Sequence, residues 1–587
     1  MPAPSPSPLA SATLPEALLR QAERTAGDPW LTLYHRDQVA CRLTRDELCR
    51  EAARWGGALR RLGVAPGDRV VLVLPTERAF YEAFWGLLWV GAVPVPIYPP
   101  VRMGRMEDYL RSLAGLLADS GARLVITDAL IRPLLRGGET PAPQDLLLVT
   151  PAELRGGEET APHPGRAEDL ALLQYTSGST GRQKGVMLSH ANLLHNIQAI
   201  GQGVGVRGGD VAVSWLPLYH DMGLIGMMLG SACLGVPLVA LSPVEFLRRP
   251  ARWLRLISEH RATFSAGPNF AYSLVARKLR EHDLEGLELS SWRVALCGAE
   301  PVQAGTVALF TRRFAPVGFR PGAFFPAYGL AENTLAVAFS EPGAPPVVAR
   351  LDAEALEERG AAVRAGAGRR SREVVSVGRP LATVGVEIRG EDGATLPEGR
   401  RGEVVVCGPS VMAGYYGNPV ATAATVRDGW LHTGDLGFLL DGRLFLCGRL
   451  KDLVIKAGRN YFAEDLEAAA AGVPGVRPGG VCAFSVDAPG RGTEEVVLVA
   501  ERATEAEARG LEDRLRQRVS EATGCRPDRV LLVAPHTLPK TSSGKLQRFR
   551  ARGWYLDGSL SRRGGERRTA GVITYLWAWA RDRLRKR

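Results

Sequence analysis

The chain has 587 residues, of which 45% are hydrophobic and 23% charged, so it has ordinary globular composition and enough length for several domains, or for one large domain with a smaller partner. Its formal net charge is +11, but residues 551–587 hold ten Lys/Arg against three Asp/Glu, so the main body does not have the basic character of a nucleic-acid-binding protein. The eight cysteines form no CxxC pair and have no histidine at zinc-like spacing, which excludes that class of metal site and favours a reducing, cytoplasmic location.

In chain order, residues 1–14 predict a flexible N-terminus without the features of a signal peptide. From about residue 68 onward, short apolar strands alternate with helical stretches, as in Tyr81–Pro96, which reads as a helix and then a strand. Met222–Leu241 is uncharged over twenty residues, but Gly235 and Pro237 interrupt it, so we expect a buried helix followed by a buried strand rather than a membrane span. This alternation predicts an α/β fold with largely parallel sheets, and after residue 442 the pattern changes to a smaller α+β module.

The stretch Thr176–Gly185 holds three glycines, two serines, two threonines and Lys184 between two apolar runs. Glycines allow close approach and positive φ, and successive N–H groups can then form a concavity that binds anions. The sequence lacks the spacing of a Walker A loop or of GxGxxG. It therefore predicts the tip of a strand–loop–strand unit that wraps a polyanion.

Six sequence blocks in a fixed order resemble the adenylate-forming enzymes, over roughly residues 15–550. The first is YTSGSTGRQKG, in which Gln183 stands where proline is common in the family. The others are AYGLAE (327–332), GEVVVCGPSVMAGYY (402–416), GWLHTGDLG (429–437), GRLKDLVIKAGRNYFAEDLE (448–467) and LPKTSSGKLQR (538–548).

The resemblance implies a large N-terminal adenylate-forming domain over residues 15–448, made of layered α/β subdomains and a small β-barrel-like subdomain. A small, mobile α+β lid domain would follow over residues 449–550, and residues 551–587 would form a basic, aromatic extension. Lys451 falls where the family has the hinge between the two domains. Such a hinge lets one site serve two half-reactions.

The family reaction joins a carboxylate to the α-phosphate of ATP, with Mg²⁺, and releases pyrophosphate. Because two anions must meet, a repulsion of about 4 kcal/mol at 4 Å has to be offset by cations and donors. The resemblance assigns Lys545 to this task, as the mobile catalytic lysine that bridges the carboxylate and the α-phosphate. Glu332 would hold Mg²⁺ together with Thr176, and His220 is a third catalytic candidate.

The nucleotide would be bound by three further groups of residues. Tyr328 and Gly329 would lie against the adenine, while Asp435 and Arg449 would bind the ribose hydroxyls. The anion loop would hold the phosphates through Thr176, Ser177, Gly178, Ser179, Thr180, Gly181 and Lys184.

The segment SWLPLYHDMGLIG (214–226) resembles the fatty acyl-AMP ligase branch, which activates medium- to long-chain acids for lipid or polyketide synthesis. His220 and Asp221 would lie at the mouth of an acyl pocket. The interval of 46 residues from Glu332 to Gly378 agrees with this branch, because its members carry an insertion there that is thought to restrain the lid and disfavour CoA. The acyl group would pass to the phosphopantetheine thiol of a separate acyl carrier protein or a carrier domain of a synthase.

Three alternatives stay open at this point: a fatty acyl-CoA ligase, an amino-acid adenylation enzyme, and an inactive homologue that serves as a scaffold. FDxS, typical of amino-acid adenylation, is replaced here by YHDMG, and the presence of the full motif set argues against an inactive protein. The tail at 571–587 has aromatic and cationic residues that would suit a membrane interface or an acidic carrier protein, or would form a disordered or packed extension.

Overall fold

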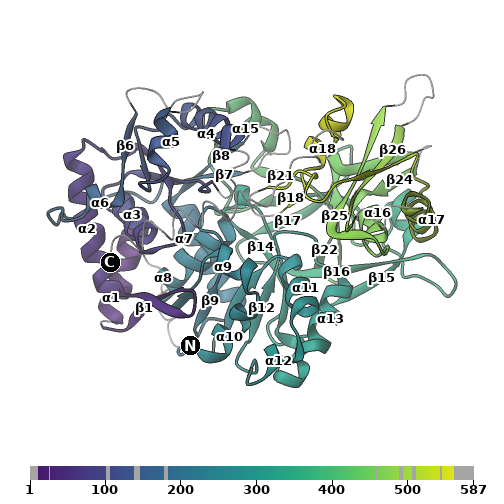
Figure 1. Ribbon diagram of the computed structural model, residues 1–587, viewed down its shortest axis with the longest axis horizontal. Helices are drawn as coiled ribbons and strands as arrows, with labels where there is room; N and C mark the ends of the chain where they lie inside the picture. Colours follow the sequence, from purple (N-terminus) through teal and green to yellow (C-terminus); the bar gives the residue numbers. More distant parts are fainter. Residues whose placement is uncertain are drawn as a thin grey trace.

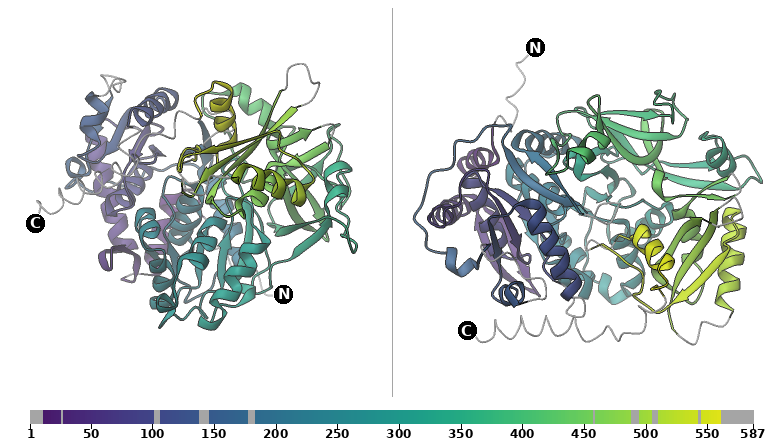
Figure 2. Two further views of the ribbon diagram at one scale, coloured as in Figure 1. Left: turned by 45° about the vertical axis from the view of Figure 1, so that its right-hand side comes forward. Right: turned by 90° about the horizontal axis from the view of Figure 1, so that it is seen from above.

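The structure is a computed structural model (Figures 1 and 2), and it describes most of the chain. The described residues are 11–25, 27–100, 106–137, 146–176, 183–456, 459–487, 494–504, 510–541 and 545–560. The N-terminal residues 1–10, the loop residues 177–182 and the tail 561–587 lie outside them, and with them lie the predictions for the flexible N-terminus and for the 571–587 extension.

The N-terminal region (purple and blue in Figure 1) contains a parallel sheet in the order β4-β3-β5-β6. Its strands are buried and apolar, as parallel strands covered by helices are. Helix α2 begins at a capping box in which Thr44 and Glu47 satisfy each other's backbone N–H groups. The elements of this region are α1 (Leu14–Arg24), β1 (Pro29–His35), β2 (Gln38–Thr44), α2 (Arg45–Arg61), β3 (Arg69–Val73), α3 (Arg78–Trp89), β4 (Val93–Pro96), α4 (Met106–Ser120), β5 (Leu124–Thr127), α5 (Arg132–Gly137), β6 (Leu147–Val149) and α6 (Pro151–Leu154).

The centre of the molecule is a long mixed sheet in the order β17-β18-β21-β22-β16-β14-β13-β12-β11-β9-β10-β1-β2. The stretch from β13 to β1 is parallel, and the stretch from β14 to β17 is antiparallel. The elements between residues 170 and 340 are β7 (Leu170–Thr176), β8 (Lys184–Ser189), α7 (His190–Val204), β9 (Ala212–Ser214), the π-helix η2 (Met222–Leu229), α8 (Gly230–Leu234), β10 (Leu238–Ala240), α9 (Pro243–Arg248), α10 (Ala251–Glu259), β11 (Phe264–Gly267), α11 (Asn269–Lys278), α12 (Glu281–Leu284), β12 (Val294–Cys297), α13 (Ala304–Phe314), η3 (Ala315–Val317), η4 (Pro321–Ala323), β13 (Phe324–Gly329), η5 (Ala331–Asn333) and β14 (Ala336–Phe339).

The antiparallel end of this sheet (green in Figure 1) carries the long interval after Glu332. Between β14 and β16, that interval contains a strand, β15, which pairs with β16, and a short helix, α14. The elements here are β15 (Val348–Asp352), α14 (Ala353–Glu358), β16 (Ser371–Pro380), β17 (Gly385–Arg389), β18 (Gly402–Cys407), β19 (Gly414–Tyr415), α15 (Pro419–Thr425), β20 (Val426–Arg427), β21 (Trp430–Leu440) and β22 (Arg443–Arg449).

The C-terminal part, residues 450–560, has buried apolar clusters of its own, one of which includes Val454, Leu498 and Val519. One of these clusters extends through Trp554 to Leu560, past residue 550 where the sequence places the end of the lid. Helix α16 begins at Ala463, because Tyr461 and Phe462 belong to the preceding strand. The elements are η6 (Leu450–Asp452), β23 (Leu453–Lys456), β24 (Arg459–Phe462), α16 (Ala463–Ala471), β25 (Val476–Asp487), β26 (Glu494–Arg502), α17 (Leu511–Thr523), β27 (Arg529–Val533) and α18 (Arg548–Leu556).

The C-terminal part packs against the long interval, as both views in Figure 2 show for the yellow-green segments beside the green ones. Phe462, only 1% exposed, joins a cluster with Leu351 and Leu356 of the interval. Two ion pairs flank it: Arg372 Nε lies 2.9 Å from Asp465 Oδ2, and Arg459 Nε lies 3.0 Å from Glu358 Oε1. The interval therefore anchors the C-terminal part to the large sheet.

Several sequence predictions are confirmed. The α/β class holds, Tyr81–Pro96 contains the end of α3 and then β4, and Met222–Leu241 is a buried helical segment followed by β10. Among the residues described, none of the helices combines the length and the apolar character needed to cross a membrane. All eight cysteines fall within the described residues and are free.

Candidate active site

The anion loop is placed by strands β7 and β8, which pair in antiparallel register from Leu170–Ser189 to Thr176–Lys184. This confirms the strand–loop–strand form, although Ser177, Gly178, Ser179, Thr180 and Gly181 lie outside the described residues. Thr176 and Lys184, at the base of the loop, line one large cavity. Ser189 caps the helix that follows β8 by accepting a hydrogen bond from the Asn192 N–H at 3.1 Å. This cap stabilises the junction between β8 and the helix.

Tyr415 connects this loop to Glu332. It lies on β19, which pairs with β8, and the Lys184 Nζ sits 4.5 Å from the centre of its ring. The Tyr415 hydroxyl donates to Glu332 Oε1 at 2.9 Å. Burial and the neighbouring Glu332 carboxylate raise the pKa of Tyr415, so the hydroxyl stays protonated and continues to donate. Tyr415 thus orients the carboxylate and holds the cation of the loop beside it.

A second cluster forms where β21, β22 and β13 meet. Asp435 and Arg449 are cross-strand partners, with Arg449 Nε 2.8 Å from Asp435 Oδ1. The Tyr328 hydroxyl donates to the other oxygen, Asp435 Oδ2, at 2.6 Å. The nearby carboxylate raises the pKa of Arg449, and burial raises the pKa of Tyr328. A Cβ on Gly329 would lie 2.0 Å from the Leu335 oxygen, so only glycine fits the tight turn after Tyr328.

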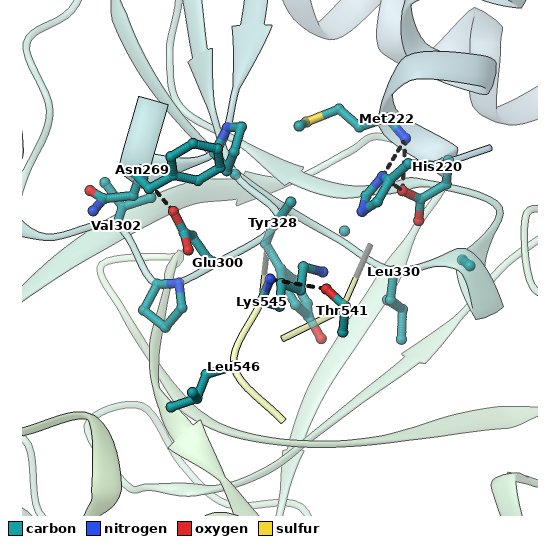
Figure 3. A pocket seen from close by; sticks show the side chains of 18 of the residues that line it. His220, Met222, Asn269, Glu300, Val302, Tyr328, Leu330, Thr541, Lys545 and Leu546 are labelled. Carbon is teal, nitrogen blue, oxygen red and sulfur yellow. Dashed lines mark hydrogen bonds and ion pairs between the residues drawn. The ribbon is translucent and has the colours of Figure 1, made fainter. Parts of the chain in front are cut away.

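Lys545 comes from the C-terminal part and lies in the same cavity, between Glu300 on one side and His220 on the other (Figure 3). Its backbone is fixed by Thr541, whose hydroxyl accepts from the Lys545 N–H at 2.9 Å. Burial lowers the pKa of Lys545, although the carboxylates of Asp221 and Glu300 favour its charged form. The half-buried lysine therefore lines the cavity with the carboxylates of Asp221 and Glu300 near it.

The dyad His220–Asp221 stands at the start of the π-helix η2. His220 Nδ1 lies 2.6 Å from Asp221 Oδ1, and this oxygen also accepts from the Met222 N–H at 2.7 Å. Burial would raise the pKa of Asp221, but His220 and Lys545 together bring it below its usual value. Long π-helices are rare and occur often at functional sites, because the wider turn displaces side chains from their α-helical positions.

Lys451 lies in η6, between the large sheet and the C-terminal part, and it lines the same cavity. Burial and Arg449 lower its pKa. The next residue, Asp452, pairs with Arg548 at 2.7 Å, and Arg548 also contacts Glu464 at 3.0 Å and Glu467 at 2.7 Å. Because Arg548 is three residues after Lys545, this network connects the lysine loop to the predicted hinge.

These residues gather around one cavity of about 3100 Å³, although they come from positions as far apart as Thr176 and Lys545. The family of AMP-binding enzymes matches residues 18–416, more than half of the chain. The chain belongs to the AMP-binding enzymes.

Similar proteins indicate the branch of the family to which this AMP-binding enzyme belongs. It is 37% identical to a putative acyl-CoA synthetase of Caulobacter vibrioides, over 91% of this chain and 94% of that protein. It is 35% identical to the medium-chain-fatty-acid–[acyl-carrier-protein] ligase JamA of Moorena producens, over 84% of this chain and 86% of that protein. A solved structure from a study of fatty acyl-adenylate ligases of E. coli and L. pneumophila superposes with a TM-score of 0.88 and 37% identity, over 94% of this chain and 99% of that one. These likenesses assign the enzyme to the fatty acyl-AMP ligase branch.

The cavity of this AMP-binding enzyme fits a magnesium ion that is held mainly by phosphates. Among the described residues, no group of three His, Cys, Asp or Glu side chains could hold a metal by itself. Mg²⁺ is often bound by one or two carboxylates plus substrate phosphates. Glu332 supplies one carboxylate at the base of the anion loop, with the Thr176 side of β7 lining the same cavity, so the donor set suits an ion that arrives with ATP.

Sequence reasoning missed three residues of this site: Tyr415, Glu300 and Arg548. Tyr415 falls in the quoted block that ends in AGYY, but only the pairing of β19 with β8 shows which tyrosine faces Glu332. Glu300 follows Ala299, whose φ of 66° is unusual for alanine and marks a constrained turn. The Glu300 carboxylate accepts from the Phe270 N–H at 2.5 Å, and burial raises its pKa.

Proposed function

We propose that this enzyme activates a fatty acid with ATP, giving an acyl-adenylate and pyrophosphate, and then passes the acyl group to the phosphopantetheine thiol of a separate carrier protein. The observation that carries the proposal is the position of Lys545 in the same cavity as Asp435, Glu332 and Lys184. A reaction between a carboxylate and a triphosphate needs cations on both reactants, and this cavity brings them together.

In the first step, a carboxylate oxygen attacks the α-phosphorus, the bond from that phosphorus to the bridging oxygen breaks, and pyrophosphate leaves with the electron pair. The Lys545 ammonium would lie between the two reacting anions and stabilise the charge that develops on the α-phosphate. Lys184 and the N–H groups of the anion loop would hold the β- and γ-phosphates. Mg²⁺, when bound by Glu332 and Thr176, would neutralise phosphate charge.

The nucleoside would be held by the Asp435 cluster. The carboxylate of Asp435 can accept both ribose hydroxyls only if its orientation is fixed, and the bonds from Tyr328 and Arg449 fix it. Tyr328 and Gly329 would also border the adenine. His220, held by Asp221, would lie where the acyl carbon enters the reaction centre.

In the second step, a thiol gives up its proton to solvent and its sulfur bonds to the acyl carbon, while the bond from that carbon to the phosphate oxygen breaks and AMP leaves with the electron pair. This step needs room for the thiol, which a rotation of the small domain, residues 449–550, about Lys451 would supply. The anchor made by Phe462, Arg372 and Asp465 opposes such a rotation. We propose that docking of a carrier protein offsets this anchor, whereas free CoA has little contact surface with which to do so.

A panel of acids tests both steps. With ATP and Mg²⁺, straight-chain fatty acids should release pyrophosphate and acetate or amino acids should not. The acyl group should then pass to a loaded carrier protein much faster than to CoA. Failure of every fatty acid would overturn the first step, and equal transfer to CoA would make the enzyme an acyl-CoA ligase.

A further inference from the structure

The cavity continues from Lys545 into the body of the protein along one face of three parallel strands, β9, β11 and β12. On the last of these strands and just after it, the cavity is lined by alternate residues, Val294, Leu296 and Gly298, as expected for one face of a strand. Val294 lies farthest from the reaction centre, and Gly298 lies next to the turn that carries Glu300. The part of the cavity that runs along these strands is called the tunnel below, and its direction is that of the strands.

A second wall is formed by the helical segment of η2 and α8, which combines small residues with the larger Met222, Met227 and Leu234. Gly226, Gly230 and Ser231 line the cavity. A Cβ on Gly226 would come within 2.9 Å of the side chain of Leu335, which also lines the cavity. The space between the sheet and this wall is thus bordered mainly by apolar groups, which suits an alkyl chain.

Deep in the cavity lies one row of the sheet, at the starts of these strands, and Val204, Val206 and Val236 also line the cavity. Phe264 pairs in register with Ala212 on one side and with Val294 on the other, and all three line the cavity. Among these three residues, Phe264 has the largest side chain. It is 9% exposed, whereas many core residues nearby are fully buried.

The ring of Phe264 is held from behind by Arg293, whose guanidinium carbon is 4.7 Å from the ring centre. Arg293 is itself fixed by an ion pair with Asp210 at 2.9 Å and by hydrogen bonds to the Val204 and Gly205 carbonyls, each at 2.9 Å. Asp210 is buried, so this support is rigid. These contacts oppose displacement of the ring by an acyl chain that reaches it.

We propose that Phe264, supported by Arg293 and Asp210, sets the length of the acyl chain and makes this enzyme selective for medium-length straight acids. The inference rests on the proposed function. From Val294 to Gly298 the strand advances four residues, or about 13 Å at about 3.3 Å per residue. An extended peptide advances up to about 3.6 Å for three bonds, or about 1.2 Å per bond, so an alkyl chain in this tunnel has room for about ten to twelve carbons.

The experiment measures kcat/KM for pyrophosphate release over straight, even-numbered acids from short to long. The wild type should gain up to about fourfold for each methylene that enters the tunnel, and then lose at least tenfold beyond the optimum. Phe264→Ala should move the optimum to acids two to four carbons longer. Leu296→Phe, which adds bulk halfway along the tunnel, should move it to shorter acids.

The matched control is Phe324→Ala, because Phe324 is also a buried phenylalanine at the start of a parallel strand, β13, the next strand but one, and is not among the residues that line the cavity. It should lower Tm and leave the position of the optimum unchanged. If Phe264→Ala keeps the wild-type optimum, the inference is wrong while the proposed function stands. If Phe264→Ala does not fold, Leu296→Phe decides, and an unchanged optimum there overturns the inference. If the wild type releases pyrophosphate with no acid of any length, the proposed function itself has failed.

Discussion

Removing the hydroxyl of Tyr415 isolates one contact on which the proposed magnesium site depends. In Tyr415→Phe the ring stays beneath Lys184, but Glu332 loses the hydrogen bond of 2.9 Å that orients it. A hydrogen bond to a charged group contributes about 1.5–3 kcal/mol, which corresponds to a fall of about 10- to 150-fold in kcat/KM. Tyr415→Leu also removes the cation–π contact with Lys184, so its loss should be greater by about 0.5–2 kcal/mol.

The assay is pyrophosphate release at saturating fatty acid, with MgATP varied and free Mg²⁺ titrated. The matched control is Tyr416→Phe, which deletes the same group from the next residue, a tyrosine that packs against a different apolar cluster. Tyr415→Phe should need more Mg²⁺ for half-maximal rate, and Tyr416→Phe should not. If Tyr415→Phe keeps the wild-type kcat/KM within twofold, as Tyr416→Phe should, then Tyr415 does not orient Glu332 for catalysis.

Four other predictions concern Lys545, Asp435 and the C-terminal part. Lys545→Ala should lower the adenylation rate by about 10²- to 10³-fold at unchanged Tm. In the wild type, the fall of kcat at high pH should begin below pH 10.5, because burial lowers the pKa of Lys545. Asp435→Asn should raise KM for ATP and leave KM for the fatty acid unchanged, since Asp435 lies in the proposed ribose cluster; equal rises in both would contradict this. Phe462→Ala should loosen the C-terminal part and raise the rate of transfer to CoA relative to a carrier protein; a constant ratio would show that the anchor does not select the acceptor. Burial lifts the pKa of Asp465 from 3.8 to about 6, so the stability it contributes is complete below pH 3.8 and falls as the pH rises to about 6; Asp465→Asn should abolish that part of the pH dependence of Tm.

The sequence predicted local structure well where a single element determines it. The helix and strand within Tyr81–Pro96 and the strands on both sides of the anion loop follow from apolar runs and glycines near to each other in the chain. The π-helical turn of Met222–Leu229 could not be predicted in this way, because a segment that is apolar on all sides carries no periodicity to distinguish one helix type from another.

What the sequence could not supply is proximity between distant elements. The resemblance pointed to Glu332 and Asp435, but the tyrosines that orient them depend on pairing between β19 and β8 and on the meeting of β13 with β21. Likewise, the resemblance to the fatty acyl-AMP ligase branch predicts an insertion after Glu332, whereas the contact of this interval with Phe462 and Asp465 depends on tertiary packing. Arg548 belonged to a recognised block, but its three acidic partners lie some 80 to 96 residues earlier in the chain.

The most direct test of the account is isotope exchange between labelled pyrophosphate and ATP, with no thiol acceptor present. The arrangement of Lys545 beside the nucleotide cluster predicts exchange that depends strictly on added fatty acid and is lost in Lys545→Ala. A protein that binds ATP but shows no exchange with any fatty acid, or a Lys545→Ala variant that exchanges at the wild-type rate, would contradict it.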